Sequence, residues 1–190
     1  MTRVPEPTRE QLDPATQAIH DRIAATRGGL RGPYGVLVHH PALCERVAAL
    51  GEQLRFHSVL SGADRELAIL AAGREAESPY EWAAHEPIAI REGTRPEAIA
   101  IVRDLASTRG LHRREALIVD TVRAISRAHR LTADEFACAE TELGRQGLIE
   151  LVTLAGYYGM IAGVLNAYEV DLPAGAKPAF GHRADNPPPR

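Results

Sequence analysis

Residues 61–93 have the sequence SGADRELAILAAGREAESPYEWAAHEPIAIREG, and this stretch decides the fold. Ser61 and Ser78, like Thr94 and Thr132 further along the chain, are each followed three residues later by an acid, a pattern typical of a helix N-terminus. The stretch therefore predicts one helix from Ser61 to about Glu75 and a second from Ser78 to Gly93, with a short turn between them.

The same helical character extends through the rest of the chain. Alanine, leucine, glutamate and arginine dominate, and runs of β-branched residues are scarce, which favours helix. Gly32-Pro33 is a turn signal, so residues 28–40 are predicted to form an irregular loop. Further helices are predicted at Pro14–Arg27, Pro41–His57, Thr94 to about Ser107, Arg113–His129, Thr132–Arg145 and Leu148 to about Val170. The predicted fold class is all-α, with roughly seven or eight helices.

The last predicted helix is the most apolar part of the chain. Its sequence, LIELVTLAGYYGMIAGVLNAYEV over residues 148–170, is apolar almost all round, which predicts burial on most sides. Glu150, Asn166 and Glu169 interrupt it, as in a core helix rather than a membrane span. Because one small bundle cannot hide this much apolar surface, we expect a homo-oligomer, whether a dimer, trimer or hexamer.

Composition excludes several classes of function. The net charge of −3 and the lack of a basic block argue against nucleic-acid binding. The sequence contains no run of 18 or more apolar residues, so no membrane span is predicted. The N-terminal sequence MTRVPEPTRE lacks the apolar stretch of a signal peptide, so a cytoplasmic protein is expected.

The cysteines and histidines do not predict a metal or redox centre. Cys44 and Cys138 are far apart and form no C-x-x-C pair, so both are predicted to be buried apolar side chains. His39 and His40 are adjacent but have no third ligand at a diagnostic spacing. We therefore expect neither a metal nor another cofactor.

Three ionisable residues form the candidate catalytic site. His85 lies four residues after Glu81, so the two share one helix face, and Glu66 lies among apolar residues on the preceding helix. Two carboxylates and an imidazole are the parts of an acid/base site. A purely structural interpretation stays open for each residue. Glu66 would be a first-turn acid that complements the helix dipole, Ser78 and Glu81 would form only a capping box, and His85 would be a paired structural histidine.

A substrate pocket is predicted around these three residues. Ser78, Tyr80, Trp82 and Tyr157 are its expected lining. Trp82 is the only tryptophan, and it either walls the pocket or packs in the core. Tyr157 is equally suited to the core, although a buried tyrosine hydroxyl needs a hydrogen-bond partner.

These residues resemble a known family, the carboxymuconolactone decarboxylases, which include the alkylhydroperoxidase D-like peroxidases. In redox members a glutamate precedes the C-x-x-C pair, and a histidine follows it; here Glu66 and His85 fit those two positions, while Ser78 and Glu81 occupy the cysteine positions. The E-W-x-x-H pattern at 81–85 is similar to the non-redox branch. The sequence GYYGMIAGVLNAYEVDLP at 156–173 is similar to the family's final helix.

The resemblance covers roughly residues 40–175, and it implies a division of the chain. Residues 1–40 would be an arm with one helix and a loop, residues 41–175 the alkylhydroperoxidase D-like helical domain, and residues 176–190 a flexible tail. Without a thiolate at positions 78 and 81, thiol peroxidase chemistry is excluded at this site.

The resemblance also implies a reaction. A decarboxylase like the family's namesake leaves a dienolate that a general acid must protonate. His85 would donate or accept the proton, and Glu81 would orient the His85 ring. Glu66 would be a second acid/base or would position water.

The namesake's substrate carries two carboxylates, and more generally we expect a small acidic or cyclic substrate. Arg55, Arg65 and Arg74 are candidates to bind a substrate carboxylate, although Arg65 and Arg74 equally suit solvated helix faces. The alternative function is a non-catalytic helical oligomer that binds a small ligand or a protein partner. In that case the two acids and His85 would form a buried structural network.

Overall fold

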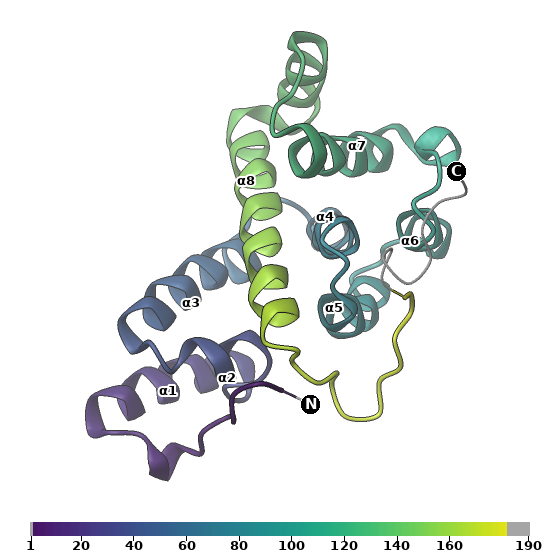
Figure 1. Cartoon of the computed structure of the whole chain (residues 1–190). Coiled ribbons are helices and arrows are strands. Elements are labelled where there is room, and N and C mark those ends of the chain that lie inside the picture. The colour runs from purple at the N-terminus through teal and green to yellow at the C-terminus, as the bar shows by residue number, and fades with distance from the viewer. Residues whose placement is uncertain (1, 182–190) are drawn as a thin grey trace. The chain divides into compact units, whose positions relative to one another are not determined.

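The computed structural model describes residues 2–181 (Figure 1). Over this range the chain forms helices and no strand, which confirms the predicted all-α fold class. The helices are α1 (Pro14–Arg27), α2 (Pro33–Leu37), α3 (Pro41–Phe56), α4 (Gly62–Glu75), α5 (Pro79–Arg91), α6 (Pro96–Arg103), α7 (Arg113–Ala128) and α8 (Ala133–Ala167), with 3-10 turns η1 (Arg9–Gln11) and η2 (Thr108–Gly110).

The described chain divides into two compact units. The first holds residues 2–57 and 164–171, and the second holds residues 58–163 and 172–181. All of α4 to α7 and most of α8 therefore belong to the second unit, which carries the candidate site. The three-part division at residues 40 and 175 stays a prediction, and residues 182–190 of the expected tail lie outside the described range.

The predicted helix starts at Thr132 and Ser61 have the expected capping contacts. The Thr132 hydroxyl accepts from the N–H of Glu135 at 3.2 Å, and the Glu135 carboxylate accepts from the N–H of Thr132 at 2.7 Å, a complete capping box. The Ser61 hydroxyl accepts from the N–H of Asp64 at 3.2 Å and so begins α4. Asp64 itself accepts from Arg114 Nε at 2.9 Å, so its carboxylate links α4 to α7.

The predicted cap at Thr94 is wrong. The Thr94 hydroxyl donates to the carbonyl of Ala63 at 3.1 Å, which ties the end of α5 to the start of α4. The next helix, α6, begins two residues later at Pro96 and ends at Arg103, earlier than predicted. A tertiary hydrogen bond has therefore taken the hydroxyl that the local pattern assigned to capping.

The predicted loop at residues 28–40 is also wrong in part, because Pro33–Leu37 forms the short helix α2. Gly32 takes the positive φ of 63° that leads into it, and Pro33 suits the first helical position. All five residues of α2 are buried. Burial of this short apolar segment outweighs the turn signal that Gly32-Pro33 gives in the sequence.

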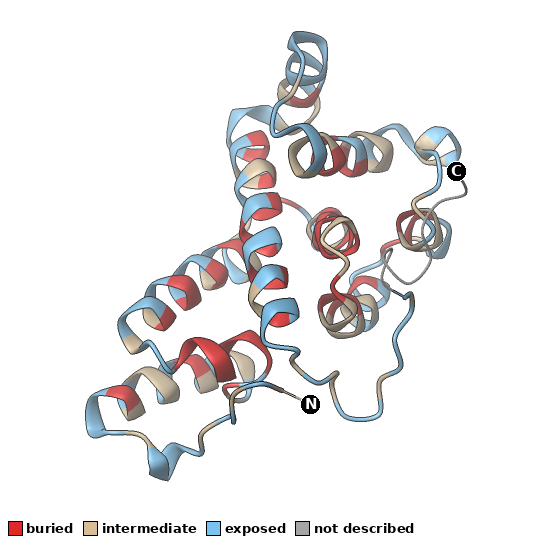
Figure 2. Cartoon of the chain, viewed as in Figure 1, coloured by how far each residue is buried: buried red, intermediate tan, exposed pale blue. Residues whose placement is uncertain are grey.

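The core of the second unit is built around α4, which packs against α5, α6 and α7. Every residue of α4 from Glu66 to Arg74 is buried, as the red colour of this helix in Figure 2 shows. A Cβ atom on Gly73 would lie 3.0 Å from the Cβ of Glu81. Glycine at this position therefore lets α5 approach α4 closely just where the candidate site lies.

The last helix, α8, is less buried than predicted. Gly144, with φ 70° and ψ 167°, breaks it into the two helical segments that the sequence predicts. In the second segment Leu148, Leu151 and Leu154 are buried, but Ile149 is 62% and Met160 is 45% exposed. The expectation of burial on most sides is therefore wrong for the single chain.

Glu150, one of the polar residues that interrupt this apolar helix, binds the segment before α4. Glu150 accepts hydrogen bonds from the N–H of Val59, at 3.1 Å, and from the hydroxyl of Ser58. By length and composition alone, α8 is the one helix of the described residues that would be long and apolar enough to cross a membrane. Half of its most apolar stretch is buried inside the molecule, and core helices pass the same test.

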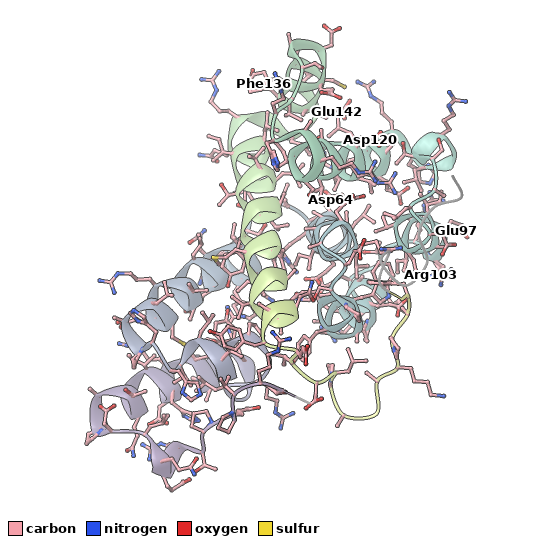
Figure 3. All side chains as sticks on the ribbon, in the orientation of Figure 1. Asp64, Glu97, Arg103, Asp120, Phe136 and Glu142 are labelled. Atoms are coloured by element: carbon pink, nitrogen blue, oxygen red, sulfur yellow. The ribbon has the colours of Figure 1, made fainter. Side chains whose placement is uncertain are left out.

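The two cysteines differ in environment. Cys44 on α3 is fully buried, as predicted, and burial raises the pKa of its thiol to about 11. Cys138 on α8 is exposed, so the prediction of a buried apolar role is wrong for it. The first segment of α8 turns most of its surface to solvent, including Phe136, which is 48% exposed (Figure 3).

Candidate functional site

His85 lies between the two carboxylates that the sequence singles out. Its Nδ1 lies 2.7 Å from Oε2 of Glu66, and its Nε2 lies 3.5 Å from Oε2 of Glu81. The three residues are only 5%, 1% and 4% exposed, in that order. The structure thus brings Glu66, Glu81 and His85 together in a buried cluster.

Local sequence explains how α4 and α5 present these groups. The Ser78 hydroxyl accepts from the N–H of Glu81 at 3.4 Å, and the N–H of Ser78 donates to the carbonyl of Gly73 at 2.9 Å. Pro79 then begins α5, and the helical spacing sets His85 one turn after Glu81. Ser78 is fully buried, so it acts as the cap of α5 at the edge of the cluster.

Arg65 belongs to the same cluster, a feature that sequence reasoning missed. Its Nε lies 3.3 Å from Oε1 of Glu66, and its Nη2 lies 4.0 Å from Glu92. Only 15% of its side chain is exposed, so the solvated helix-face interpretation is wrong. The available signal was its position next to Glu66, with Glu66 predicted to be buried.

The other two arginines contact other parts of the chain. Arg74 is 9% exposed and donates from Nε to the carbonyl of Arg103 at 2.7 Å, so it too is not a solvated helix-face charge. Arg55 belongs to the first unit, where its guanidinium lies 5.2 Å from the ring centroid of Phe56.

Two tyrosines of α8 extend the site with aromatic contacts. The ring of Tyr158 meets His85 edge-on, with 5.3 Å between centroids and an interplanar angle of 88°. Tyr157, the predicted pocket residue, packs edge-on against Tyr158 at 5.3 Å. Both tyrosines are at most 5% exposed. Tyr158 is thus the tyrosine in contact with His85, and Tyr157 lies behind it.

Trp82 is fully buried and packs against a residue of the C-terminal segment. Its ring lies 5.7 Å from that of Phe180, edge to face, and the guanidinium of Arg74 lies 4.2 Å from the Phe180 centroid. The Trp82 indole N–H is buried without an acceptor among residues 2–181. Tyr80, the remaining predicted pocket residue, is only partly buried in the first turn of α5.

Electrostatics explain why these groups cluster. A carboxylate removed from water is costly unless a charge or a hydrogen-bond donor compensates it. Glu66 has both, from His85 at one oxygen and Arg65 at the other. Among the described residues no group of three or more His, Cys, Asp or Glu side chains is arranged to hold a metal ion. The cluster is suited to moving a proton between an imidazole and two acids.

The family model for the carboxymuconolactone decarboxylase family matches residues 41–119, which include the whole Glu66–His85 segment. Over these residues the chain is similar to the carboxymuconolactone decarboxylase family. Ser78 and Glu81 stand at the positions where redox members would carry cysteines, so this chain has no thiol there. No curated protein matches the chain.

Two solved structures share the fold. An uncharacterized peroxidase-related protein from Ralstonia eutropha JMP134, described as having an alkylhydroperoxidase AhpD core, has a TM-score of 0.76 at 15% identity, over 91% of this chain and 93% of that one. A peroxidase-related protein from Silicibacter sp. TM1040 has a TM-score of 0.70 at 16% identity, over 91% of this chain and 92% of that one. These similarities confirm the predicted alkylhydroperoxidase D-like fold.

Proposed function

We propose that this protein is a carboxymuconolactone decarboxylase-like, cofactor-independent enzyme that carries out acid/base chemistry on a small acidic or cyclic substrate. The observation that carries the proposal is the buried His85, with a carboxylate at each ring nitrogen. A positioned proton donor or acceptor accelerates a reaction by about 10²–10⁴-fold. The expected reaction is a decarboxylation or a related lactone or proton-transfer step.

The two distances suggest different roles for the two acids. The 2.7 Å contact to Glu66 is a short hydrogen bond, which suits the group that orients the imidazole. The 3.5 Å separation from Glu81 is too long for a good hydrogen bond, which leaves Nε2 and Glu81 as the pair that exchanges a proton with substrate. This reverses the roles that the sequence and the family resemblance imply for Glu66 and Glu81.

For a decarboxylation the steps balance without a cofactor. The bond between the substrate and its carboxylate breaks, carbon dioxide leaves, and the electron pair stays as an enolate. A proton from the Nε2 side of His85 then forms the new C–H bond, and a proton from water restores the imidazole. A nearby hydrogen-bond donor would stabilise the enolate oxygen, and the Trp82 N–H is a candidate.

The names of the two structural neighbours raise thiol peroxidase activity as another possibility. Serine and glutamate at positions 78 and 81 supply no thiolate nucleophile, which argues against it at this site. The two cysteines that the chain has, on α3 and α8, lie outside the Glu66–His85 segment.

A non-catalytic role for the cluster is the second candidate. Both ring nitrogens of His85 already face carboxylates, and all three residues are at most 5% exposed. Such a network is also what a structural core would contain. The protein would then be a helical oligomer that binds a small ligand or a protein partner.

We also propose that the chain forms a homo-oligomer and works in the cytoplasm. The exposed apolar side chains Ile149 and Met160 of α8, with Gly156 exposed between them, support association through this helix. Sedimentation velocity of the wild type and Ile149→Asp tests it. A smaller particle for the variant is expected, and an unchanged one would contradict the proposed interface.

A metabolite screen tests the catalytic proposal. Wild type, His85→Ala and Glu66→Gln are compared for carbon dioxide release and proton uptake, with circular dichroism to show that each variant is folded. Both variants are expected to lose about 100-fold or more in turnover. His57→Ala and Glu97→Gln, at exposed positions away from the cluster, are the matched controls and should keep full activity. A folded His85→Ala variant with wild-type turnover would contradict the proposal.

A further inference from the structure

The segment that follows α8 places an aromatic side chain against α4 and α5. Residues 172–181 form no helix, and they lie in the same compact unit as α4 and α5. Phe180 packs edge-on against Trp82 of α5, with 5.7 Å between the ring centroids and 82° between the ring planes. The guanidinium of Arg74, on α4, lies 4.2 Å from the centre of the same phenyl ring. Side chains from two helices therefore converge on the Phe180 ring.

The two side chains that hold this ring are themselves firmly placed. Trp82 is 1% exposed, and Arg74 is buried with its Nε donating to the carbonyl of Arg103 at 2.7 Å. The indole N–H of Trp82 is nevertheless buried without an acceptor among residues 2–181. A buried donor in this state is rare and costly. The site around Phe180 thus combines an aromatic wall, a cation and a hydrogen-bond donor.

The C-terminal segment itself is held less firmly than the site that it covers. Phe180 is only partly buried. Within the described part of the chain, the one hydrogen bond of residues 172–181 is internal, from the N–H of Ala176 to the carbonyl of Pro173 at 2.9 Å. Irregular segments of this kind move on the nanosecond to microsecond timescale. The Phe180 ring can therefore leave the site while α4 and α5 stay folded.

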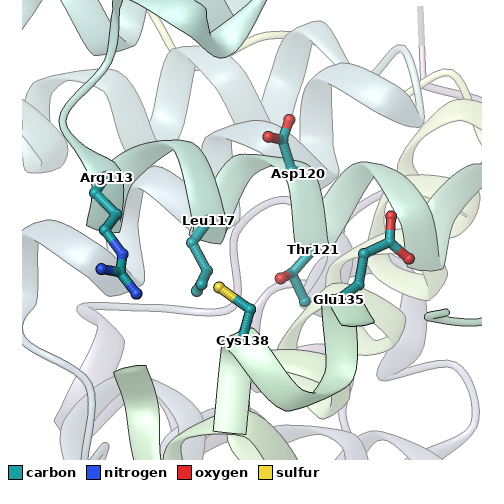
Figure 4. A pocket seen from close by; sticks show the side chains of 6 residues that line it. All are labelled: Arg113, Leu117, Asp120, Thr121, Glu135 and Cys138. Atoms are coloured by element: carbon teal, nitrogen blue, oxygen red, sulfur yellow. The ribbon is translucent and has the colours of Figure 1, made fainter. Parts of the chain in front are cut away.

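The hollow between α7 and α8 lacks this convergence. It has a volume of about 260 Å³ and is lined by Arg113, Leu117, Asp120, Thr121, Glu135 and Cys138 (Figure 4). The Asp120 carboxylate points away from Thr121 and Cys138 (Figure 4). It accepts from the hydroxyl of Thr108 at 2.9 Å, and both lining acids are exposed. The groups around this α7–α8 hollow therefore do not meet at one point, unlike those around Phe180.

We propose that Phe180 occupies a binding site for a small aromatic carboxylate, which binds by displacing the Phe180 ring. The ring of the ligand would lie edge-on to Trp82 and beside the Arg74 guanidinium. Its carboxylate would pair with Arg74, and an oxygen of the ligand would accept from the Trp82 N–H. The site rests on the proposed function only for the reaction that its ligand undergoes, because binding needs no proton transfer.

Fluorine NMR observes the displacement directly. The chain has three phenylalanines, so the full-length protein made with 4-fluorophenylalanine should give three resonances. Phe56 and Phe136 are 47% and 48% exposed, and they serve as internal references. Hydrocinnamate is the probe, and phenylethanol and phenethylammonium are neutral and cationic analogues of similar size.

The expected result is a saturable shift of the Phe180 resonance toward those of the two exposed phenylalanines when hydrocinnamate is added. Phenylethanol should act only at a higher concentration, and phenethylammonium should not act, because Arg74 repels its charge. A Phe180 resonance that hydrocinnamate leaves unmoved, or that phenethylammonium moves equally, would overturn the proposal.

Variants of the two partners change the affinity in opposite directions. Phe180→Ala removes the competing ring and should lower the Kd of hydrocinnamate, measured by calorimetry, by about three- to tenfold. Phe136→Ala is the matched control and should leave the Kd unchanged. Arg74→Gln should raise the Kd by about tenfold or more, while Arg74→Lys keeps the charge and should retain the preference for the anion. A Kd unaffected by both Phe180→Ala and Arg74→Gln would contradict the site.

Turnover measurements separate this site from the proposed reaction. Aromatic carboxylates that displace Phe180 but release no carbon dioxide and take up no proton would confirm the site and count against the reaction. Turnover of another class of substrate, with the Phe180 resonance unmoved by hydrocinnamate, would support the reaction and overturn the site.

Discussion

The α4–α5 cluster and the α7–α8 hollow each carry two acids, but in different surroundings. Glu66 and Glu81 are at most 4% exposed and share His85 between them. Asp120 and Glu135 are exposed and are each satisfied by a neighbouring threonine. Burial therefore makes the first pair of acids depend on His85 for compensation, while solvent leaves the second pair independent.

The largest expected effect is on stability, when one partner of the buried cluster is removed. Glu66→Ala leaves His85 and Arg65 without their shared acceptor in the core. Breaking a buried pair in this way costs about 3–5 kcal/mol. Urea denaturation measures the free energy of unfolding.

Asp120→Ala is the matched control at the α7–α8 hollow, and it should change the free energy of unfolding by no more than about 0.5 kcal/mol. Equal losses for Glu66→Ala and Asp120→Ala would show that burial does not separate the two groups of acids.

Thiol labelling compares the two environments without a mutation. Cys138 should react with iodoacetamide like a free thiol, while Cys44 must wait for the structure to open, because it is fully buried and its pKa is raised to about 11. We expect the rates to differ by about 100-fold or more. Mass spectrometry of the labelled peptides measures both rates in one sample. Comparable rates in the native protein would contradict the burial of Cys44.

The ion pair between Arg95 and Glu115 is an intermediate case, because both side chains are partly buried. Its two hydrogen bonds are 2.9 Å and 2.6 Å long, and Arg95 holds the pKa of Glu115 below its usual range. Glu115→Gln should cost about 1 kcal/mol at neutral pH.

Because the folded-state pKa of Glu115 is lowered, its contribution is complete above the unfolded pKa of about 4.3 and is lost as the pH falls through the folded value. The difference between wild type and variant should therefore shrink as the pH falls below about 4. A difference that stays constant down to pH 2 would contradict this account.

The smallest effect concerns the contact between Trp82 and the C-terminal segment. Phe180→Ala removes the edge-to-face contact at 5.7 Å, worth about 0.5–1.5 kcal/mol. Because Trp82 is the only tryptophan, its fluorescence reports the change directly. Acrylamide quenching should increase in Phe180→Ala and stay unchanged in Phe136→Ala, a control at an exposed aromatic residue. Equal quenching in all three proteins would show that Phe180 does not cover Trp82.

Local patterns in the sequence predicted the elements that local interactions decide. Ser61, Ser78 and Thr132 cap the helices that the sequence predicts to begin there. The four-residue spacing of Glu81 and His85 on one helix correctly predicted that their side chains lie close together. The meeting of Glu66 with His85 across two helices followed from the family resemblance as well as from residue types.

Tertiary contacts decided what the sequence did not predict. The Thr94 hydroxyl bonds to Ala63, Arg74 bonds to the carbonyl of Arg103, and Cys138 is exposed on α8. Each depends on a neighbour distant in the chain or on which side of a helix meets the core. No cap or period in a single segment carries that information.

The most direct test of the account is the state of the His85 ring, observed by NMR of the ¹⁵N-labelled protein. We predict a proton on Nδ1, held by Glu66 at 2.7 Å and protected from exchange with water, and loss of that protection in Glu66→Ala under conditions where the variant is folded. An Nδ1 proton that exchanges as fast as that of the exposed His57, or one unaffected by Glu66→Ala, would contradict the claim that Glu66 orients this imidazole.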